Sequence, residues 1–191
     1  MVNLTRIYTR TGDDGTTSLG DMSRTTKNDL RLIAYADVDE ANCVVGVVLA
    51  ASELAPDVRQ VLLRIQNELF DVGADLCTPV IAKPEFPPLR VETDYIERLE
   101  AEIDNSNAEV PALRSFVLPG GTPASAHLHV ARTVVRRAER ATWSAMAEHG
   151  DEMSSLPATY LNRLSDLLFV LARHANLATG DILWKPGGER A

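Results

Sequence analysis

The chain has 191 residues, of which 45% are hydrophobic, and this length and composition suit one globular domain. Its formal net charge of −8 argues against a nucleic-acid binder, which usually presents a basic surface. The two cysteines, Cys43 and Cys77, form no Cys-x-x-Cys pair, so a disulfide scaffold or a structural zinc site is not expected. The first residues lack the apolar run of a signal peptide, and no stretch is long enough to span a bilayer. We therefore expect a cytoplasmic protein that binds neither nucleic acid nor membrane.

Residues 1–27 are polar, rich in threonine, glycine and aspartate, and show no helical period. We expect a loop or an extended arm there. Its three glycines permit tight backbone turns, and successive amide groups in such turns can bind an anion. The segment 15–20 resembles the first half of a P-loop, but Asp21 and Met22 replace the Lys-Ser/Thr pair that a P-loop requires. Taken alone, the segment is best interpreted as an ordinary flexible arm.

Five later segments carry apolar residues at the three- and four-residue spacing of one helix face. They are 29–54, 56–76, 92–105, 122–148 and 157–179. No segment alternates convincingly with period two. The sequence therefore predicts an all-α fold, a five-helix bundle of four long helices and one shorter helix. In a single domain, residues 1–27 form the arm, residues 28–180 the bundle and residues 181–191 a C-terminal tail.

The fourth predicted helix contains a basic stretch, 132–140. Arg132, Arg136 and Arg140 are four residues apart, so they project from one side of the helix, which we call the arginine face. Like charges at this spacing repel, and an anion above them would relieve the repulsion, because guanidinium groups match phosphate oxygens. Glu139 lies three residues after Arg136 and could orient it. The spacing alone modestly favours the alternative, a solvated basic face with ion pairs along the helix.

Two other helices carry polar groups near their apolar stripes. The first helix has four of them near its middle: Asp37, Asp39, Glu40 and Asn42. These residues could bind a metal or pair with the arginines, and an ion-pair network is the more common case. In the last helix, Asn162 and Asp166 share a face. That pair fits a ligand site, and it fits a hydrogen-bond staple between helices at least as well.

Several common catalytic patterns do not occur in the sequence. There are no Glu-x-x-His pairs of the kind found in di-iron bundles, and His127 and His129 do not face the same side of a helix. There is no Gly-x-Gly-x-x-Gly after a strand and no Gly-x-Ser-x-Gly elbow. Conventional dehydrogenase, hydrolase and P-loop NTPase functions therefore lack support.

Together and in this order, five motifs resemble those of the PduO-type ATP:corrinoid adenosyltransferases. They are IYTRTGDDG at 7–15, YADVDEAN at 35–42, FVLPGGT at 116–122, HVARTVVRRAER at 129–140 and LNRLSD at 161–166. The resemblance covers nearly the whole chain. It implies a homotrimer in which each ATP site lies between adjacent subunits.

The resemblance also assigns roles to individual residues. In the arm, ATP would be bound by Thr9, Arg10, Thr11, Gly12, Thr17, Ser18 and Lys27. On the helices, ATP would be bound by Arg136, Arg137, Ala138, Glu139, Arg140 and Asn162. Mg²⁺ would accompany the phosphates. Arg132 would pair with Asp39 of the neighbouring subunit, and Phe116 would lie against the lower face of the corrin.

The activity implied by the resemblance is transfer of the 5′-deoxyadenosyl group of ATP to the cobalt of cob(I)alamin, giving adenosylcobalamin and triphosphate. Lys27 and Arg136 would stabilise the leaving triphosphate, and Phe116 would keep water or a base from the cobalt. The expected protein partners are a reductase and an adenosylcobalamin-dependent acceptor enzyme. Three alternatives stay open: a non-catalytic carrier of adenosylcobalamin, a nucleotide-sensing bundle that binds no corrin, and an NTPase.

Overall fold

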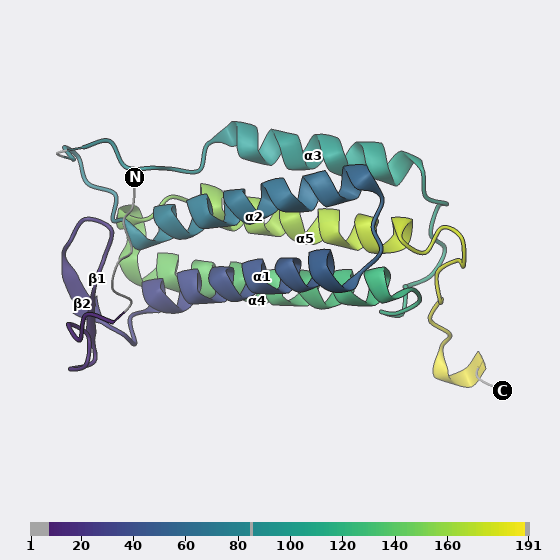
Figure 1. Cartoon of the computed structure of the whole chain (residues 1–191), viewed down its shortest axis with the longest axis horizontal. Helices are drawn as coiled ribbons and strands as arrows, with labels where there is room; N and C mark the ends of the chain where they lie inside the picture. Colours follow the sequence, from purple (N-terminus) through teal and green to yellow (C-terminus); the bar gives the residue numbers. More distant parts are fainter. Residues whose placement is uncertain (1–7, 85, 190–191) are drawn as a thin grey trace.

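The computed structural model describes residues 8–84 and 86–189, so Ile7 of the first motif and the last two residues of the tail lie outside it. The helices are α1 Leu30–Ala51, α2 Pro56–Cys77, α3 Thr93–Ala108, α4 Pro123–His149 and α5 Leu156–His174. Figure 1 shows them side by side in one bundle, with the N-terminal arm at one end and the C-terminal tail at the other. The predicted all-α bundle is confirmed. One 3-10 turn, Gly150–Glu152, lies between α4 and α5, and another, Gly187–Glu189, lies in the tail.

The arm contains a small hairpin that the sequence did not predict. Strands β1 Thr16–Ser18 and β2 Arg24–Thr26 pair in antiparallel fashion. Each strand has three residues, which is too short for an alternating pattern to be recognised. The Gly20 amide donates to the Cys77 carbonyl oxygen at 2.9 Å and so ties the hairpin to the end of α2. A side chain at Gly20 would collide with Thr78, so glycine permits this close approach.

The two ends of α4 follow local sequence signals, whereas α1 ends three residues before the predicted boundary, α3 three residues after it, and α5 five residues before it. Thr122 caps α4 by accepting a hydrogen bond from the Ser125 amide, and Pro123 occupies the first turn, as predicted. Gly150, with a φ of 56°, ends the same helix. Helix α5 ends at His174 instead of continuing to 179, because turns that are hydrogen-bonded around Asn176 carry the chain onward.

The bundle core is continuous and is built from all five helices. Helix α1 packs against α2 and α4, and α5 packs against α3 and α4. Fully buried core residues include Val45, Leu62, Ile65, Leu99, Leu128, Leu164 and Leu168. Each side chain of this size stabilises the fold by about 1.5–3 kcal/mol when buried. The packed core therefore holds the helices, and the side chains on their surfaces, in fixed relative positions.

None of the helices in the described ranges is both long and apolar enough to cross a membrane.

Asp29 joins three elements at the arm end of the bundle. Its carboxylate accepts from the Arg31 amide at 2.8 Å and so caps α1. It also accepts from Thr25 Oγ1 at 2.6 Å and from His149 Nε2 of α4 at 2.8 Å. Partial burial opposes the charge, but the hydrogen bonds from Thr25, Arg31 and His149 outweigh it and hold the pKa of Asp29 below its usual value.

We expect Asp29→Asn to lower the free energy of unfolding by about 1 kcal/mol at pH 7, because charge-assisted hydrogen bonds are lost. A carboxylate with a depressed pKa stabilises the fold above its unfolded pKa of about 3.9 and loses that contribution as the pH falls through its folded pKa. The difference between variant and wild type should therefore shrink below about pH 4. Urea unfolding of both proteins measures this difference in the free energy of unfolding, once at pH 7 and once at the lowest pH at which both proteins stay folded. An equal difference at both pH values would refute this role.

Candidate functional site

The arm residues expected to bind ATP lie around a single pocket of about 400 Å³. Its lining includes Thr9, Arg10, Thr11, Gly12, Thr17, Ser18 and Lys27. Residues before, within and after the hairpin therefore meet at one surface. Arg24 also lines this pocket and donates from Nη2 to the Thr11 carbonyl oxygen at 2.9 Å. Arg24 has no local sequence signal for this role, because only the hairpin brings it back over Thr11.

Lys27 lies directly against the turn at Gly12. A Cβ on Gly12 would approach Lys27 Cε and Nζ to 3.2 Å and the Thr16 carbonyl oxygen to 2.9 Å. The Lys27 amide donates to the Gly15 carbonyl oxygen at 2.9 Å, which fixes the two segments together. The pocket thus combines a glycine turn, several hydroxyls and positive charge, which is a composition suited to an anion.

The arginine face forms a second pocket, of about 470 Å³, on the surface of α4. Arg136 and Arg140 are exposed there and form no ion pair with any other described residue. Arg137 differs, because it pairs with Asp37 at 3.6 Å and with Glu40 on α1. The hydrogen bond to Glu40 and the nearby Asp37 charge raise the pKa of Arg137. The expected ion-pair network between the first helix and the arginines is therefore confirmed for Arg137.

The structure corrects two expectations about this helix. Ala138 leaves the expected nucleotide-contact set, because the helical period places its methyl group fully inside the core. Glu139 does not orient Arg136. Its Oε1 instead accepts from Asn162 Nδ2 of α5 at 3.2 Å.

Asn162 acts as a staple between two helices. Besides its bond to Glu139, its Oδ1 accepts from Arg163 Nη1 at 2.8 Å. Asp166 pairs with Arg163 at 3.8 Å. The staple interpretation is confirmed for Asn162, whereas the ion pair of Asp166 lies within α5, and a ligand role for Asn162 stays a prediction.

Arg132 and Asp39 do not pair with each other within the described chain. Arg132 is partly buried, and burial, followed by the charge of Arg136, lowers the pKa of Arg132. Asp39 is exposed and lines a pocket of about 560 Å³ between α1 and α2, together with Tyr35 and Phe70. A single chain therefore leaves both groups available for the predicted contact between subunits.

Phe116 is held at a fixed position by the tail. The Trp184 amide donates to the Phe116 carbonyl oxygen at 2.8 Å, and the Leu118 amide donates to the Ile182 carbonyl oxygen at 2.8 Å. We call residues 116–118 and 182–184 the Phe116 ribbon. The Phe116 ring is 78% exposed and packs edge-on against Trp184, with 6.1 Å between ring centroids. The sequence left the role of the tail undecided, and the structure shows that it supports Phe116.

The arm and the C-terminal tail lie at opposite ends of the bundle (Figure 1), and Phe116 is hydrogen-bonded to the tail. Helix α1, which runs between these ends, has 22 residues and is about 33 Å long at about 1.5 Å per residue. The arm pocket and the Phe116 ring of one chain are therefore separated by about the length of a helix.

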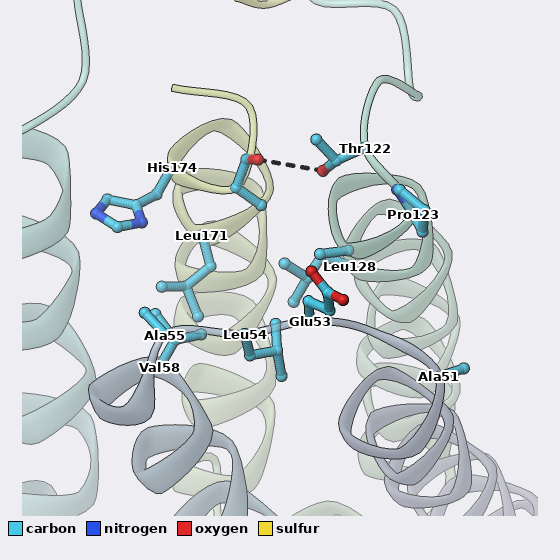
Figure 2. A pocket seen from close by; sticks show the side chains of 12 residues that line it. Ala51, Glu53, Leu54, Ala55, Val58, Thr122, Pro123, Leu128, Leu171 and His174 are labelled. Atoms are coloured by element: carbon cyan, nitrogen blue, oxygen red, sulfur yellow. Dashed lines mark hydrogen bonds between the residues drawn. The ribbon is translucent and has the colours of Figure 1, made fainter. Parts of the chain in front are cut away.

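Another pocket, of about 590 Å³, lies at the end of the bundle where α4 begins and α5 ends (Figure 2). Its lining is mostly apolar and comes from the α1–α2 connection, the start of α4 and the end of α5. Thr122 Oγ1 donates to the Ala175 carbonyl oxygen at its edge, at 3.1 Å. None of the expected site residues lines this pocket, so it is not the candidate site.

Comparison with known proteins identifies the family. Residues 7–175 match the sequence model of the family described as cobalamin adenosyltransferase. The chain belongs to this family. The corrinoid adenosyltransferase of Mycobacterium tuberculosis (strain H37Rv) is 62% identical over 189 residues, covering 99% of this chain and 97% of that protein. The corrinoid adenosyltransferase of Bacillus subtilis (strain 168) is 40% identical over 178 residues, covering 92% and 89%.

Solved structures of the cobalamin adenosyltransferase family agree with the fold. A variant of the PduO-type ATP:corrinoid adenosyltransferase from Lactobacillus reuteri, in complex with cobalamin and ATP, matches with a TM-score of 0.87. It is 38% identical, and the match covers 95% of this chain and 97% of that chain. The resemblance drawn from the five motifs is thereby confirmed.

The described residues of this cobalamin adenosyltransferase family member include no group of three or more His, Cys, Asp or Glu side chains placed to hold a metal ion.

Proposed function

We propose that this protein transfers the 5′-deoxyadenosyl group of ATP to the cobalt of cob(I)alamin and releases triphosphate. The observation that carries the proposal is the open arginine face, since Arg136 and Arg140 are exposed and without ion pairs in an acidic protein. Exposed guanidinium groups at one-turn spacing suit a chain of phosphates. The family and the ligands of the Lactobacillus reuteri structure support adenosine and a corrin as the other parts of the site.

The reaction requires no nucleophile from the protein. The cobalt(I) electron pair attacks the 5′ carbon of ATP, a cobalt–carbon bond forms, and the carbon–oxygen bond to triphosphate breaks. The leaving triphosphate takes the electrons of that bond, and cobalt becomes formally cobalt(III). The cofactor thus performs the substitution, and the protein orients the substrates and stabilises the charge of the leaving group.

In this mechanism the arm binds ATP and the arginine face receives the triphosphate. The Lys27 ammonium group and the Arg136 guanidinium group lower the barrier by stabilising charge that develops on the leaving oxygen. Arg140 holds the more distant phosphates, and Arg137, already paired with Asp37 and Glu40, fixes the position of the face. Mg²⁺ would bind through the phosphate oxygens and would add positive charge at the same place.

We place each active site between two subunits of a homotrimer. The separation of the arm from Phe116 supports this arrangement, because one chain cannot bring the two surfaces together. Arg132 of one subunit would meet Asp39 of its neighbour and fix their relative position. A reductase that supplies cob(I)alamin and an acceptor enzyme that consumes adenosylcobalamin are the protein partners this reaction requires.

The test is to mix the protein and MgATP with chemically reduced cob(I)alamin under anaerobic conditions. We expect the cob(I)alamin absorbance to disappear, a light-sensitive adenosylcobalamin to form, and one intact triphosphate to appear for each product. Release of inorganic phosphate instead would identify an NTPase. ATP binding without loss of cob(I)alamin would refute the transferase function and leave the carrier and sensor alternatives.

Gly12→Ala should raise the KM for ATP by about tenfold, because its methyl group would press on the Thr16 carbonyl and displace Lys27. The melting temperature should stay within about 2 °C of wild type, since the arm lies outside the core. Steady-state kinetics and thermal unfolding measure the two effects. Gly188→Ala is the matched control, because a side chain there has open space, and it should leave the KM unchanged. An unaltered KM in Gly12→Ala would remove the arm pocket from the ATP site.

A further inference from the structure

Most of the buried polar atoms that lack a hydrogen-bond partner among the described residues belong to one neighbourhood. They include both ring nitrogens of His129, Ser125 Oγ, Arg132 Nε and Asp181 Oδ1. The His129 side chain is only 3% exposed. An unpaired buried polar group costs about 1–3 kcal/mol, so a concentration of such groups in one place calls for a role.

The fold brings these groups together from α4 and the tail. Ser125, His129 and Arg132 follow one another at spacings of four and three residues, so they share one side of α4. Asp181 comes from the start of the tail, where its Oδ2 accepts from Arg173 Nε at 2.8 Å and its Oδ1 is left over. The charges of both Arg132 and Asp181 act on the His129 ring.

The hydrogen-bonding capacities of three of these groups are complementary. Arg132 Nε has one hydrogen to donate, and Asp181 Oδ1 has a lone pair to accept one. A neutral imidazole has one acceptor nitrogen and one donor N–H, which matches both. Burial, followed by the charge of Arg132, lowers the pKa of His129, and Asp181 offsets only part of this, so the ring is neutral at pH 7.

We propose that His129 is a positioning residue that accepts a hydrogen bond relayed by buried water from Arg132 Nε and donates one relayed by buried water to Asp181 Oδ1, since these atoms form no direct hydrogen bond with one another in the structure. Asp181 immediately precedes the tail strand of the Phe116 ribbon. His129 therefore connects the side chain expected to meet the neighbouring subunit with the segment that supports Phe116. The Arg132 Nη atoms are left for Asp39 of the neighbour. This inference rests on the proposed function, in which Arg132 fixes the position of the neighbouring subunit, and on the expected contact of Phe116 with the corrin.

His129→Phe tests the inference, because it keeps a ring that can pack edge-on against Phe169, now 6.1 Å away between centroids, and removes both nitrogens. The KM for cobalamin should rise by about tenfold, the loss typical of one hydrogen bond to a charged group. The KM for ATP and the kcat at saturating cobalamin should change less than about twofold. His129→Gln, whose amide has both a donor and an acceptor, should recover much of the affinity.

The matched control is His127→Phe on the same helix. His127 Nδ1 is hydrogen-bonded to Ser52 Oγ at 3.0 Å. Within the part of the chain that the structure describes, His127 makes no hydrogen bond to Arg132 or Asp181. This variant should keep the wild-type KM for cobalamin. Two results would overturn the inference: an unchanged KM in His129→Phe, or a His129→Gln protein as impaired as His129→Phe, since that would indicate a purely steric role.

Nitrogen-15 NMR of the wild-type histidines gives a second test that does not depend on how the variants fold. The chain has four histidines, so the His129 signal can be assigned by comparison with the variants or by its slow exchange. We expect one fixed neutral tautomer with a slowly exchanging ring N–H. Rapid averaging of tautomers, or a protonated ring at pH 7, would overturn the inference. Absence of turnover by wild-type protein would instead refute the proposed function, and the NMR result would still decide the His129 contact.

Discussion

Arg136→Ala should reduce kcat/KM for adenosyl transfer by about a thousandfold while the bundle stays folded. Arg136 is exposed on α4 and makes no ion pair with the other described residues, so the fold loses little when it is truncated. The transition state loses a great deal, because a donor aimed at developing charge is worth about a hundredfold to a thousandfold in rate, and a guanidinium on a phosphate group often more. Stopped-flow absorbance with pre-reduced cob(I)alamin measures the rate.

Two further variants make the Arg136 result specific. Arg136→Lys keeps the charge but loses the two-pronged geometry, so its rate should lie between those of wild type and Arg136→Ala. Lys83→Ala removes an exposed cation in the α2–α3 connection and should behave as wild type. If Arg136→Ala and Lys83→Ala had equal activity, the arginine face would not be the triphosphate site.

Phe116→Ala should slow adenosyl transfer from cob(II)alamin and a reductant by about tenfold or more, and the Kd for ATP should change less than about twofold. An apolar ring on the lower face excludes water or a base from the cobalt. Cobalt(II) is easier to reduce when neither water nor a base coordinates its lower face. Removing the Phe116 ring would admit such a ligand and so make reduction harder. When pre-reduced cob(I)alamin is supplied, most of the defect should disappear. The absorbance spectrum of bound cob(II)alamin in the presence of ATP should show the change of cobalt coordination directly.

Phe86→Ala is the matched control for Phe116→Ala. Phe86 is 75% exposed, close to the 78% of Phe116, but it lies in the α2–α3 connection away from the Phe116 ribbon. It should have wild-type rates with both cobalamin oxidation states. Equal rates for Phe116→Ala and wild type with cob(II)alamin would remove Phe116 from the corrin site.

Much of the fold was predictable, because the helices depend on signals within a few residues. Apolar spacing indicated all five helices, and Thr122 with Pro123 marked the start of α4 correctly. The errors lie where distant contacts decide the structure. The hairpin is tied by a bond between Gly20 and the end of α2, and α5 ends just before Asn176, whose side chain is hydrogen-bonded to Gly120 and Thr122.

The candidate site was predictable to a similar degree. The motifs indicated the arm residues and the arginine face, and each set lies around one pocket. Arg24 was missed because it enters the arm pocket only through strand pairing. Ala138 belongs to the continuous motif, but a helix turns every third or fourth residue toward the core, and this buries Ala138 completely. The support that Trp184 gives Phe116 joins segments far apart in sequence, and no local pattern indicates it.

Because the arm and Phe116 lie at opposite ends of the bundle, subunits that carry different inactivating mutations can complement one another. If each site joins the arm of one copy to the Phe116 ribbon of another, the contact is head-to-tail between two different patches, and it must close into a ring or continue as a filament. In a ring, a copy with a defective arm still supplies an intact ribbon to its neighbour. Two inactive versions of the chain, damaged at opposite ends, could then restore one working site when they assemble together. Two versions damaged at the same end could not.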